Sequence, residues 1–196
     1  MPVPVPMVVH SREVNNKEKR MNTRRWFLLA VALFALVLPA CAAGAEGPKV
    51  GDKVVDFQLK SVNGRLVKTA EARKDRVFVL KMGATWCGWC NKQIPHLNKV
   101  QQEYGNKVAV IDVDIEEPLS RVKTHNEKNG VKYTTVLDTN GQVAARYGVQ
   151  GIPVLIIADK DGKIVYRGNY TEYEVLKAKI DELLKPKGES APAPKG

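Results

Sequence analysis

The stretch that decides the fold covers residues 76–90 and reads RVFVLKMGATWCGWC. Its first half is a short apolar run rich in β-branched residues, which is typical of a strand buried on both faces of a sheet. Its second half ends in two cysteines, Cys87 and Cys90, separated by Gly88 and Trp89. Positions three apart on a helix share one face, so the two sulfur atoms are expected to form and break a disulfide.

An amphipathic helix is predicted directly after the cysteines and is expected to end near Gly105. Its apolar side chains recur every three or four residues: Ile94, Leu97, Val100 and Tyr104. Cys87 therefore falls at the helix N-terminus, where unpaired N–H groups and the helix dipole stabilise an anion. We expect the pKa of Cys87 to lie below that of a free thiol. Cys87 should attack, and Cys90 should resolve the mixed disulfide.

The cysteine count favours redox chemistry over metal binding. The chain has only three cysteines, and the third, Cys41, lies far from the pair. A tetrahedral zinc site normally takes four Cys or His ligands, whereas the histidines here are scattered: His10, His96 and His125. We therefore expect no metal and no cofactor apart from the Cys87–Cys90 disulfide.

Strands and helices alternate along the rest of the folded region. In chain order we expect a hairpin of residues 56–59 and 65–67, a strand at 108–113, a helix at 119–129, a hairpin of 154–158 and 164–166, and a helix that starts at Thr171. Thr171 and Glu174 have the spacing of a capping box. The strand at 108–113 should run parallel to the first strand because a helix connects them. One α/β domain over residues 51–185 is predicted.

Four acids cluster after the strand at 108–113: Asp112, Asp114, Glu116 and Glu117. Carboxylates this close together could bind a cation. A solvated loop is the favoured interpretation, because most charge runs are simply exposed.

The sequence at 86–90, Pro95 and residues 151–153 together resemble the active site, the helix proline and the cis-proline loop of the thioredoxin superfamily. Within it the chain resembles the membrane-tethered TlpA/ResA branch. This resemblance implies a thioredoxin fold, in which helices flank a central mixed sheet. It also implies an inserted segment, residues 116–150, before the cis-proline, in addition to the N-terminal β-hairpin predicted above.

The resemblance also implies a substrate-binding surface. In this family the cis-proline loop lies against the cysteines, so the backbone of Ile152 before Pro153 is expected to pair with an incoming extended peptide. Trp86, Gly88 and Trp89 are expected to contact the same peptide. The alternative is that residues 151–153 form only a turn that starts a strand.

Lys81 departs from the family pattern, since many thioredoxins carry a buried acid six positions before the first cysteine. A cation near the pair favours a thiolate, so Lys81 is expected to lower the pKa of at least one thiol. The alternative is that its aliphatic stem packs on apolar neighbours while its ammonium group reaches water.

The N-terminal region indicates export. Basic residues 24–25 precede an apolar stretch at 26–38, so residues 1–40 are predicted to be a secretory signal peptide. Both Met1 and Met21 stay open as its start. Residues 38–41 resemble a lipobox, which predicts lipidation of Cys41; ordinary cleavage after residues 43–45 is the alternative. Residues 41–50 would then form a tether, and residues 186–196 are predicted to be a disordered tail.

The charge does not indicate a nucleic-acid partner. The chain has a formal net charge of +10, but its basic residues form no arginine stripe or RNA-binding motif. The secretory signal and the lipobox instead predict a periplasmic or otherwise extracytoplasmic lipoprotein anchored in the membrane, and the resemblance to the membrane-tethered branch agrees with this. Its implied activity is thiol–disulfide oxidoreductase. It would reduce protein disulfides such as those of apocytochrome c during cytochrome c biogenesis, with electrons from a membrane thiol reductase.

Three other functions stay open from the sequence. The first is disulfide oxidation or isomerisation of secreted proteins. The second is a copper or haem chaperone that uses the thiols as ligands, although the chain lacks the wider cysteine spacing of copper carriers. A peroxidase is the weakest, because Ala84 occupies the position three residues before Cys87 where such enzymes have Thr or Ser.

Overall fold

The computed structural model describes residues 46–185. The predicted signal peptide at 1–40, the lipidation site Cys41, the start of the tether and the tail at 186–196 lie outside these residues, so they remain predictions. Within the described part, none of the helices combines the length and the apolar character needed to cross a bilayer.

A five-stranded mixed sheet forms the centre of the domain. Its spatial order is β5 (Thr134–Asp138), β4 (Val108–Ile115), β3 (Val77–Gly83), β6 (Val154–Ala158) and β7 (Ile164–Gly168). β3, β4 and β5 are parallel, whereas β6 and β7 run antiparallel to their neighbours. This arrangement confirms the predicted mixed sheet and the parallel pairing of the first two long strands.

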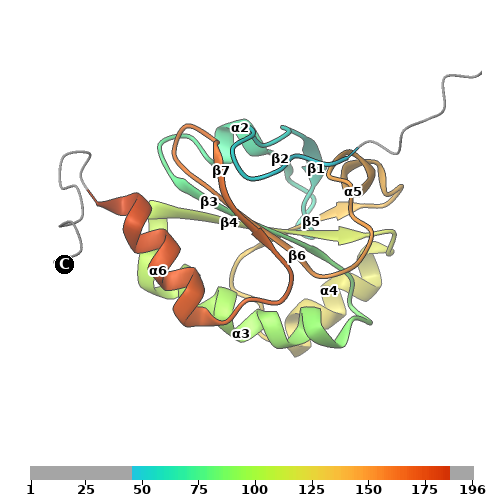
Figure 1. The fold of residues 1–196 in the computed structure, drawn as a ribbon. Coiled ribbons are helices and arrows are strands. Elements are labelled where there is room, and N and C mark those ends of the chain that lie inside the picture. Colours follow the sequence, from blue (N-terminus) through green and yellow to red (C-terminus); the bar gives the residue numbers. More distant parts are fainter. Residues whose placement is uncertain (1–45, 186–196) are drawn as a thin grey trace, which may run out of the picture. The chain divides into compact units, whose positions relative to one another are not determined.

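Helices and a hairpin cover the two faces of this sheet (Figure 1). One face carries α3 (Gly88–Tyr104), α4 (Leu119–Lys128) and α6 (Tyr173–Leu184). The other carries the antiparallel hairpin of β1 (Gln58–Lys60) and β2 (Leu66–Lys68), together with α2 (Thr69–Ala72) and α5 (Gln142–Arg146). A short 3-10 turn, η1 (Gly105–Lys107), joins α3 to β4.

The central strand β3 has every residue buried, as its apolar run predicts. Successive side chains of a strand point to opposite faces. Phe78 and Leu80 accordingly pack in the core beneath the hairpin, and Val77 and Val79 pack against α3 and α6. The same alternation places Lys81 on the face covered by α3, in an otherwise apolar strand.

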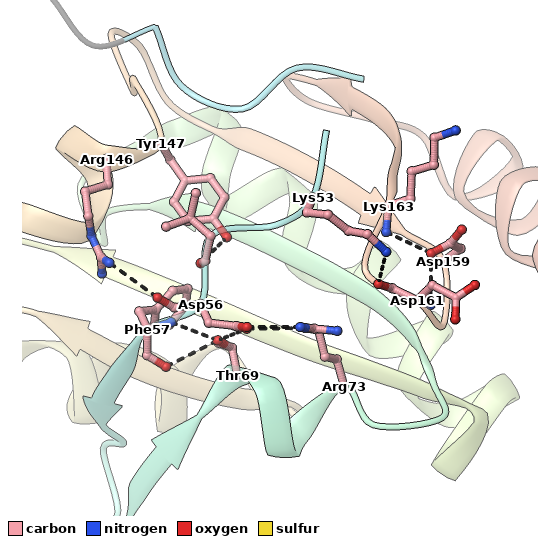
Figure 2. A network of polar contacts seen from close by, with 11 residues as sticks. Lys53, Asp56, Phe57, Thr69, Arg73, Arg146, Tyr147, Asp159, Asp161 and Lys163 are labelled. Atoms are coloured by element: carbon pink, nitrogen blue, oxygen red, sulfur yellow. Dashed lines mark hydrogen bonds and ion pairs between the residues drawn. The ribbon is translucent and has the colours of Figure 1, made fainter. Parts of the chain in front are cut away.

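Polar contacts fasten the segment before β1 onto the domain (Figure 2). The Arg73 guanidinium lies 3.0 Å from the Asp56 carboxylate and holds the pKa of Asp56 below its usual value. The Tyr147 hydroxyl donates to the carbonyl of Val55 at 2.8 Å, and Arg146 donates to the carbonyl of Asp56. These bonds hold the hairpin over the face of the sheet opposite α3.

The segment at 116–150 adds α4, β5 and α5, and so extends the sheet by one parallel strand. The predicted capping box of the last helix is wrong. α6 begins at Tyr173 with Glu172 as its N-cap residue, and the cap makes no side-chain hydrogen bond. Thr171 instead bonds to the neighbouring Asn169 carbonyl and to Gln93 of α3.

Candidate active site

The two cysteines lie where β3 passes into α3. Cys87 is the N-cap residue of α3, and Cys90 stands one turn inside the helix. The two residues are joined by a disulfide with their Cα atoms 5.2 Å apart. Cys87 is 6% exposed and Cys90 1%, so only the first sulfur borders the surface. The backbone N–H of Cys90 points at the Cys87 sulfur from 3.1 Å, which is the geometry that stabilises a thiolate at that position.

The loop before β6 lies directly against this pair. The Ile152–Pro153 peptide bond is cis, and the Ile152 carbonyl oxygen is 3.7 Å from the Cys87 sulfur. Asn169, just after β7, donates to the Pro153 carbonyl at 3.2 Å and holds the loop from behind. The predicted approach of residues 151–153 to the cysteines is therefore present.

Two tryptophans of the Cys-x-x-Cys stretch, Trp86 before Cys87 and Trp89 between the cysteines, are exposed at the surface. Trp86 is 71% exposed and Trp89 is 56% exposed, which is unusual for large aromatic side chains in a folded domain. Trp89 packs against Tyr170 with ring centroids 5.2 Å apart, and the Lys92 ammonium lies 4.2 Å from the Trp89 ring. Exposed aromatic rings beside a reactive group offer contact area to a partner chain.

Thr85, in the approach to Cys87, is held at three atoms. Glu117 accepts from its backbone N–H at 2.6 Å and from its hydroxyl at 2.7 Å. The Asn91 amide of α3 donates to its carbonyl at 3.1 Å, and His125 of α4 hydrogen-bonds Asn91. The connection between β3 and the cysteines is thus braced from both helices.

Glu117 remains ionised in this position. Burial raises its pKa, but the bonds from Thr85, together with those from Asp114 and Arg121, outweigh burial and lower the pKa below the usual value.

Lys81 is buried beneath the disulfide. It is only 4% exposed, and its ammonium nitrogen lies 2.9 and 3.0 Å from the two carboxylate oxygens of Asp112. The alternative in which this ammonium reaches water does not match these contacts. A Cβ placed on Gly83 would meet the Cys90 sulfur at 2.8 Å and the Lys81 nitrogen at 3.0 Å. Both atoms occupy the space that the missing Gly83 side chain leaves, so the ammonium is a neighbour of the inner sulfur.

The acid cluster is largely buried, so its interpretation as a solvated loop is wrong for three of the four residues: Asp112, Asp114 and Glu117. Along β4, Asp112 and Asp114 alternate with apolar residues that pack in the core beneath the hairpin. Successive side chains of a strand point to opposite faces, so both carboxylates lie on the face covered by α3. Burial, followed by the charges of Glu117 and Asp112, raises the pKa of Asp114 to about 8. Within the described residues, no group of three or more His, Cys, Asp or Glu side chains is arranged to hold a metal ion.

Several of the residues that shape the site carry no signal in the sequence. Gln93 is fully buried and exchanges two hydrogen bonds of 2.8 Å with the backbone of Thr171, which ties α3 to the loop before α6. Asn91, His125 and Glu117 likewise act through contacts between elements distant in the chain. Spacing patterns report on one element at a time, so they could not identify these residues.

A Cys-x-x-Cys disulfide at a helix N-terminus, directly against a cis-proline loop and on a mixed five-stranded sheet, defines a thioredoxin-fold thiol–disulfide oxidoreductase. The chain belongs to the AhpC/TSA family, which residues 50–167 match.

Its relatives include the thiol–disulfide oxidoreductases named ResA. The one from Bacillus subtilis strain 168 is 29% identical over 175 residues, covering 87% of this chain and 96% of the relative. The one from Geobacillus thermodenitrificans strain NG80-2 is 30% identical over 158 residues, covering 79% of this chain and 90% of the relative. The resemblance to the ResA group of the thioredoxin superfamily is therefore confirmed.

Solved structures agree with this assignment. A structure from Chlorobium tepidum, described as a thiol:disulfide interchange protein DsbE, is 27% identical with a TM-score of 0.65 and covers 70% of this chain and 99% of its own. A structure from Bacteroides thetaiotaomicron, described as a protein disulfide isomerase, is 29% identical with a TM-score of 0.64 and covers 70% of this chain and 91% of its own.

Proposed function

We propose that this oxidoreductase works outside the cytosol as a reductant of protein disulfides, with the Cys-x-x-Cys-His haem sites of apocytochrome c as its substrate class. The single observation that carries the proposal is the placement of Cys87, the more exposed of the two cysteines. It lies at a helix N-terminus, its sulfur contacts the Ile152 carbonyl, and exposed tryptophans stand at positions 86 and 89. The similarity to ResA and to DsbE supports it. Export by the signal at 1–40, a lipid anchor on Cys41 and a membrane thiol reductase as electron donor complete the proposal.

The chemistry runs through two displacements. The reduced enzyme's Cys87 thiolate attacks one sulfur of a substrate disulfide, and the other substrate sulfur leaves as a thiolate. Cys90 then attacks Cys87, the bond from Cys87 to the substrate breaks, and the second substrate sulfur leaves. Two enzyme thiols are oxidised to the Cys87–Cys90 disulfide while the substrate disulfide is reduced to two thiols. A membrane reductase then returns two electrons to the enzyme.

Substrate contacts follow from the groups around the sulfur. An extended peptide that pairs with the backbone of Ile152, beside Pro153, brings its own disulfide next to Cys87, since the Ile152 carbonyl is 3.7 Å from that sulfur. Trp86 and Trp89 supply apolar contact on either side, and Gly88 leaves open space at the helix start because a Cβ there would meet no atom within 4 Å.

Lys81 is proposed to tune the pair. Its buried ammonium lies beside the Cys90 sulfur across Gly83, where a positive charge stabilises the thiolate that must attack Cys87. Asp112 holds the ammonium in that place.

A trapping experiment tests the proposal. In the Cys90→Ala variant the resolving step is lost, so exported protein substrates should accumulate as mixed disulfides on Cys87 and be recoverable after alkylation. The matched control Cys87→Ala should trap none. Equal capture by both variants, or capture by neither, would contradict the proposed exchange.

The reduction potential separates the reductant from the oxidase alternative. A value near that of thioredoxin, about −270 mV, is expected for a reductant, and a value near −120 mV, as in strongly oxidising relatives, would contradict the proposed direction. Stoichiometric copper or haem binding by the reduced protein, without turnover of disulfides, would favour the chaperone alternative instead.

A further inference from the structure

One carboxyl oxygen beneath the disulfide has no partner. Among the buried acids around Lys81, both oxygens of Asp112 lie within 3.0 Å of the ammonium, and both oxygens of Glu117 accept hydrogen bonds from Thr85. Asp114 differs, because its Oδ1 atom is buried and accepts or donates no hydrogen bond. A buried polar atom without a partner is costly unless it serves a purpose.

The strand register places this carboxyl beside the inner cysteine. Asp114 pairs with Gly83 across the parallel strands β4 and β3, and neighbouring strands lie about 4.8 Å apart. The space above Gly83 is filled by the Cys90 sulfur and the end of Lys81. The Asp114 side chain therefore stands on the face of the sheet that carries the Cys90 sulfur and the Lys81 ammonium, one strand away from the Gly83 position that both of them approach.

Cys90 needs a proton acceptor in the resolving step. It is almost fully buried, so bulk water cannot readily take its proton. Lys81 is already a cation held by Asp112, and Gln93, the buried polar side chain one turn further along α3, cannot accept an acidic proton and is engaged with Thr171. Of the three buried acids of the cluster, Asp114 is therefore the one with a carboxyl oxygen outside these contacts.

We propose that Asp114 is the acid–base residue of Cys90. In the resolving step its carboxylate takes the proton from the Cys90 thiol. The freed electron pair of the sulfur forms the bond to Cys87, the Cys87–substrate bond breaks, and the substrate sulfur leaves as a thiolate that water protonates. When the enzyme disulfide is reduced again, the protonated Asp114 returns the proton to Cys90. This assignment rests on the proposed exchange function.

The electrostatics agree with a group that changes protonation during the cycle. With a pKa raised to about 8 by burial and by the charges of Glu117 and Asp112, Asp114 holds or releases a proton near neutral pH. The charged groups that act on Asp114 are Glu117, Asp112 and Lys81. One step further out, Arg121 bonds Glu117, the buried Tyr133 feels the charge of Asp112, and His125 bonds Asn91 of α3.

Stopped-flow reduction of a nitrobenzoate disulfide tests the proposal on the full chain. Each attack releases one coloured thiolate, so the first phase reports Cys87 and the second reports resolution by Cys90. Relative to wild type, Asp114→Asn should leave the first phase unchanged. Near neutral pH the substitution should slow the second phase about tenfold or more. At alkaline pH Cys90 ionises without a proton acceptor, so the rate of the second phase in the variant should approach that of wild type. Asp114→Glu should restore part of the neutral-pH rate.

The control is Asp138→Asn, another buried acid with one unpartnered oxygen, which lies at the end of β5 and should leave both phases unchanged. A wild-type pH profile in Asp114→Asn, or a second phase slowed equally at every pH, would overturn the assignment. Absence of the first phase in wild type would instead contradict the exchange function itself.

Carbon NMR of the wild-type protein gives a readout that does not depend on a variant folding. The Asp114 carboxyl should show one titration step in the disulfide form. In the reduced form it should show an additional step shared with the Cys90 thiol, because coupled groups titrate as a pair. Identical single titrations in both redox forms would overturn the proposal.

Discussion

At the scale of single residues, Asp114 links folding stability to pH. Its pKa is raised from 3.8 to about 8 in the fold, so the native state holds a proton that the unfolded chain releases above pH 4. The native state therefore loses stability as the pH rises from about 4 to about 8, and the loss levels off above that range. Urea unfolding should show wild type losing stability relative to Asp114→Asn across this window. A constant difference between the two proteins would contradict a buried, protonated Asp114.

Lys81 offers a second test at this scale. Removing it alone would leave Asp112 as an uncompensated buried charge, at a cost of about 3–5 kcal/mol, so the informative variant is Lys81→Met/Asp112→Asn. Without the ammonium beside Cys90, the pKa of that thiol should rise by about one unit or more. Alkylation rates of the reduced protein measured against pH give both thiol pKa values. An unchanged pair of values would leave Lys81 with no redox role.

At the scale of elements, the connection from β3 to α3 depends on Glu117. The carboxylate binds Thr85 at two points, and charged hydrogen bonds of this kind contribute about 1.5–3 kcal/mol each. Glu117→Gln should therefore destabilise the fold at neutral pH and slow the first phase of exchange, because the approach to Cys87 loosens.

The pH dependence of this variant has a defined sign. The pKa of Glu117 is below its usual 4.5 in the fold, so its contribution is present above that value and is lost as the pH falls through the lower folded pKa. The difference in unfolding free energy between wild type and Glu117→Gln should shrink in acid. The adjacent Glu116→Gln serves as the control, and equal effects of the two substitutions would contradict the role given to Glu117.

The elements themselves were largely predictable from the sequence. The apolar run at 77–80 and the period of α3 predict β3, the helix and the position of Cys87, because burial and periodicity act locally. The start of α6 was not predictable, because Thr171 hydrogen-bonds Asn169 and the distant Gln93 and does not cap the helix. The burial of Asp112 was missed for a similar reason: its partner, Lys81, is supplied by the neighbouring strand. Asp114 lies two positions further along β4 on the same face and is buried with it.

At the scale of the whole molecule, the redox state sets the stability of the domain. In a reductant the disulfide form is the more stable one, and closing even a loop of a few residues contributes about 2 kcal/mol by chain entropy. Urea unfolding of the oxidised protein should therefore have a higher midpoint than that of the reduced protein. The reverse order would indicate a stabilised dithiol, as in strongly oxidising relatives, and would contradict the proposed direction of electron flow.

The whole site depends on Cys87 being a ready nucleophile at the N-terminus of α3. The most direct measurement is the pKa of the Cys87 thiol in the reduced protein, taken from the pH dependence of its alkylation rate in the Cys90→Ala variant. The Cys90 N–H directed at the sulfur and the helix dipole predict a pKa about one unit or more below the free-thiol value of about 8.5. A pKa at or above that of free cysteine would contradict the mechanism.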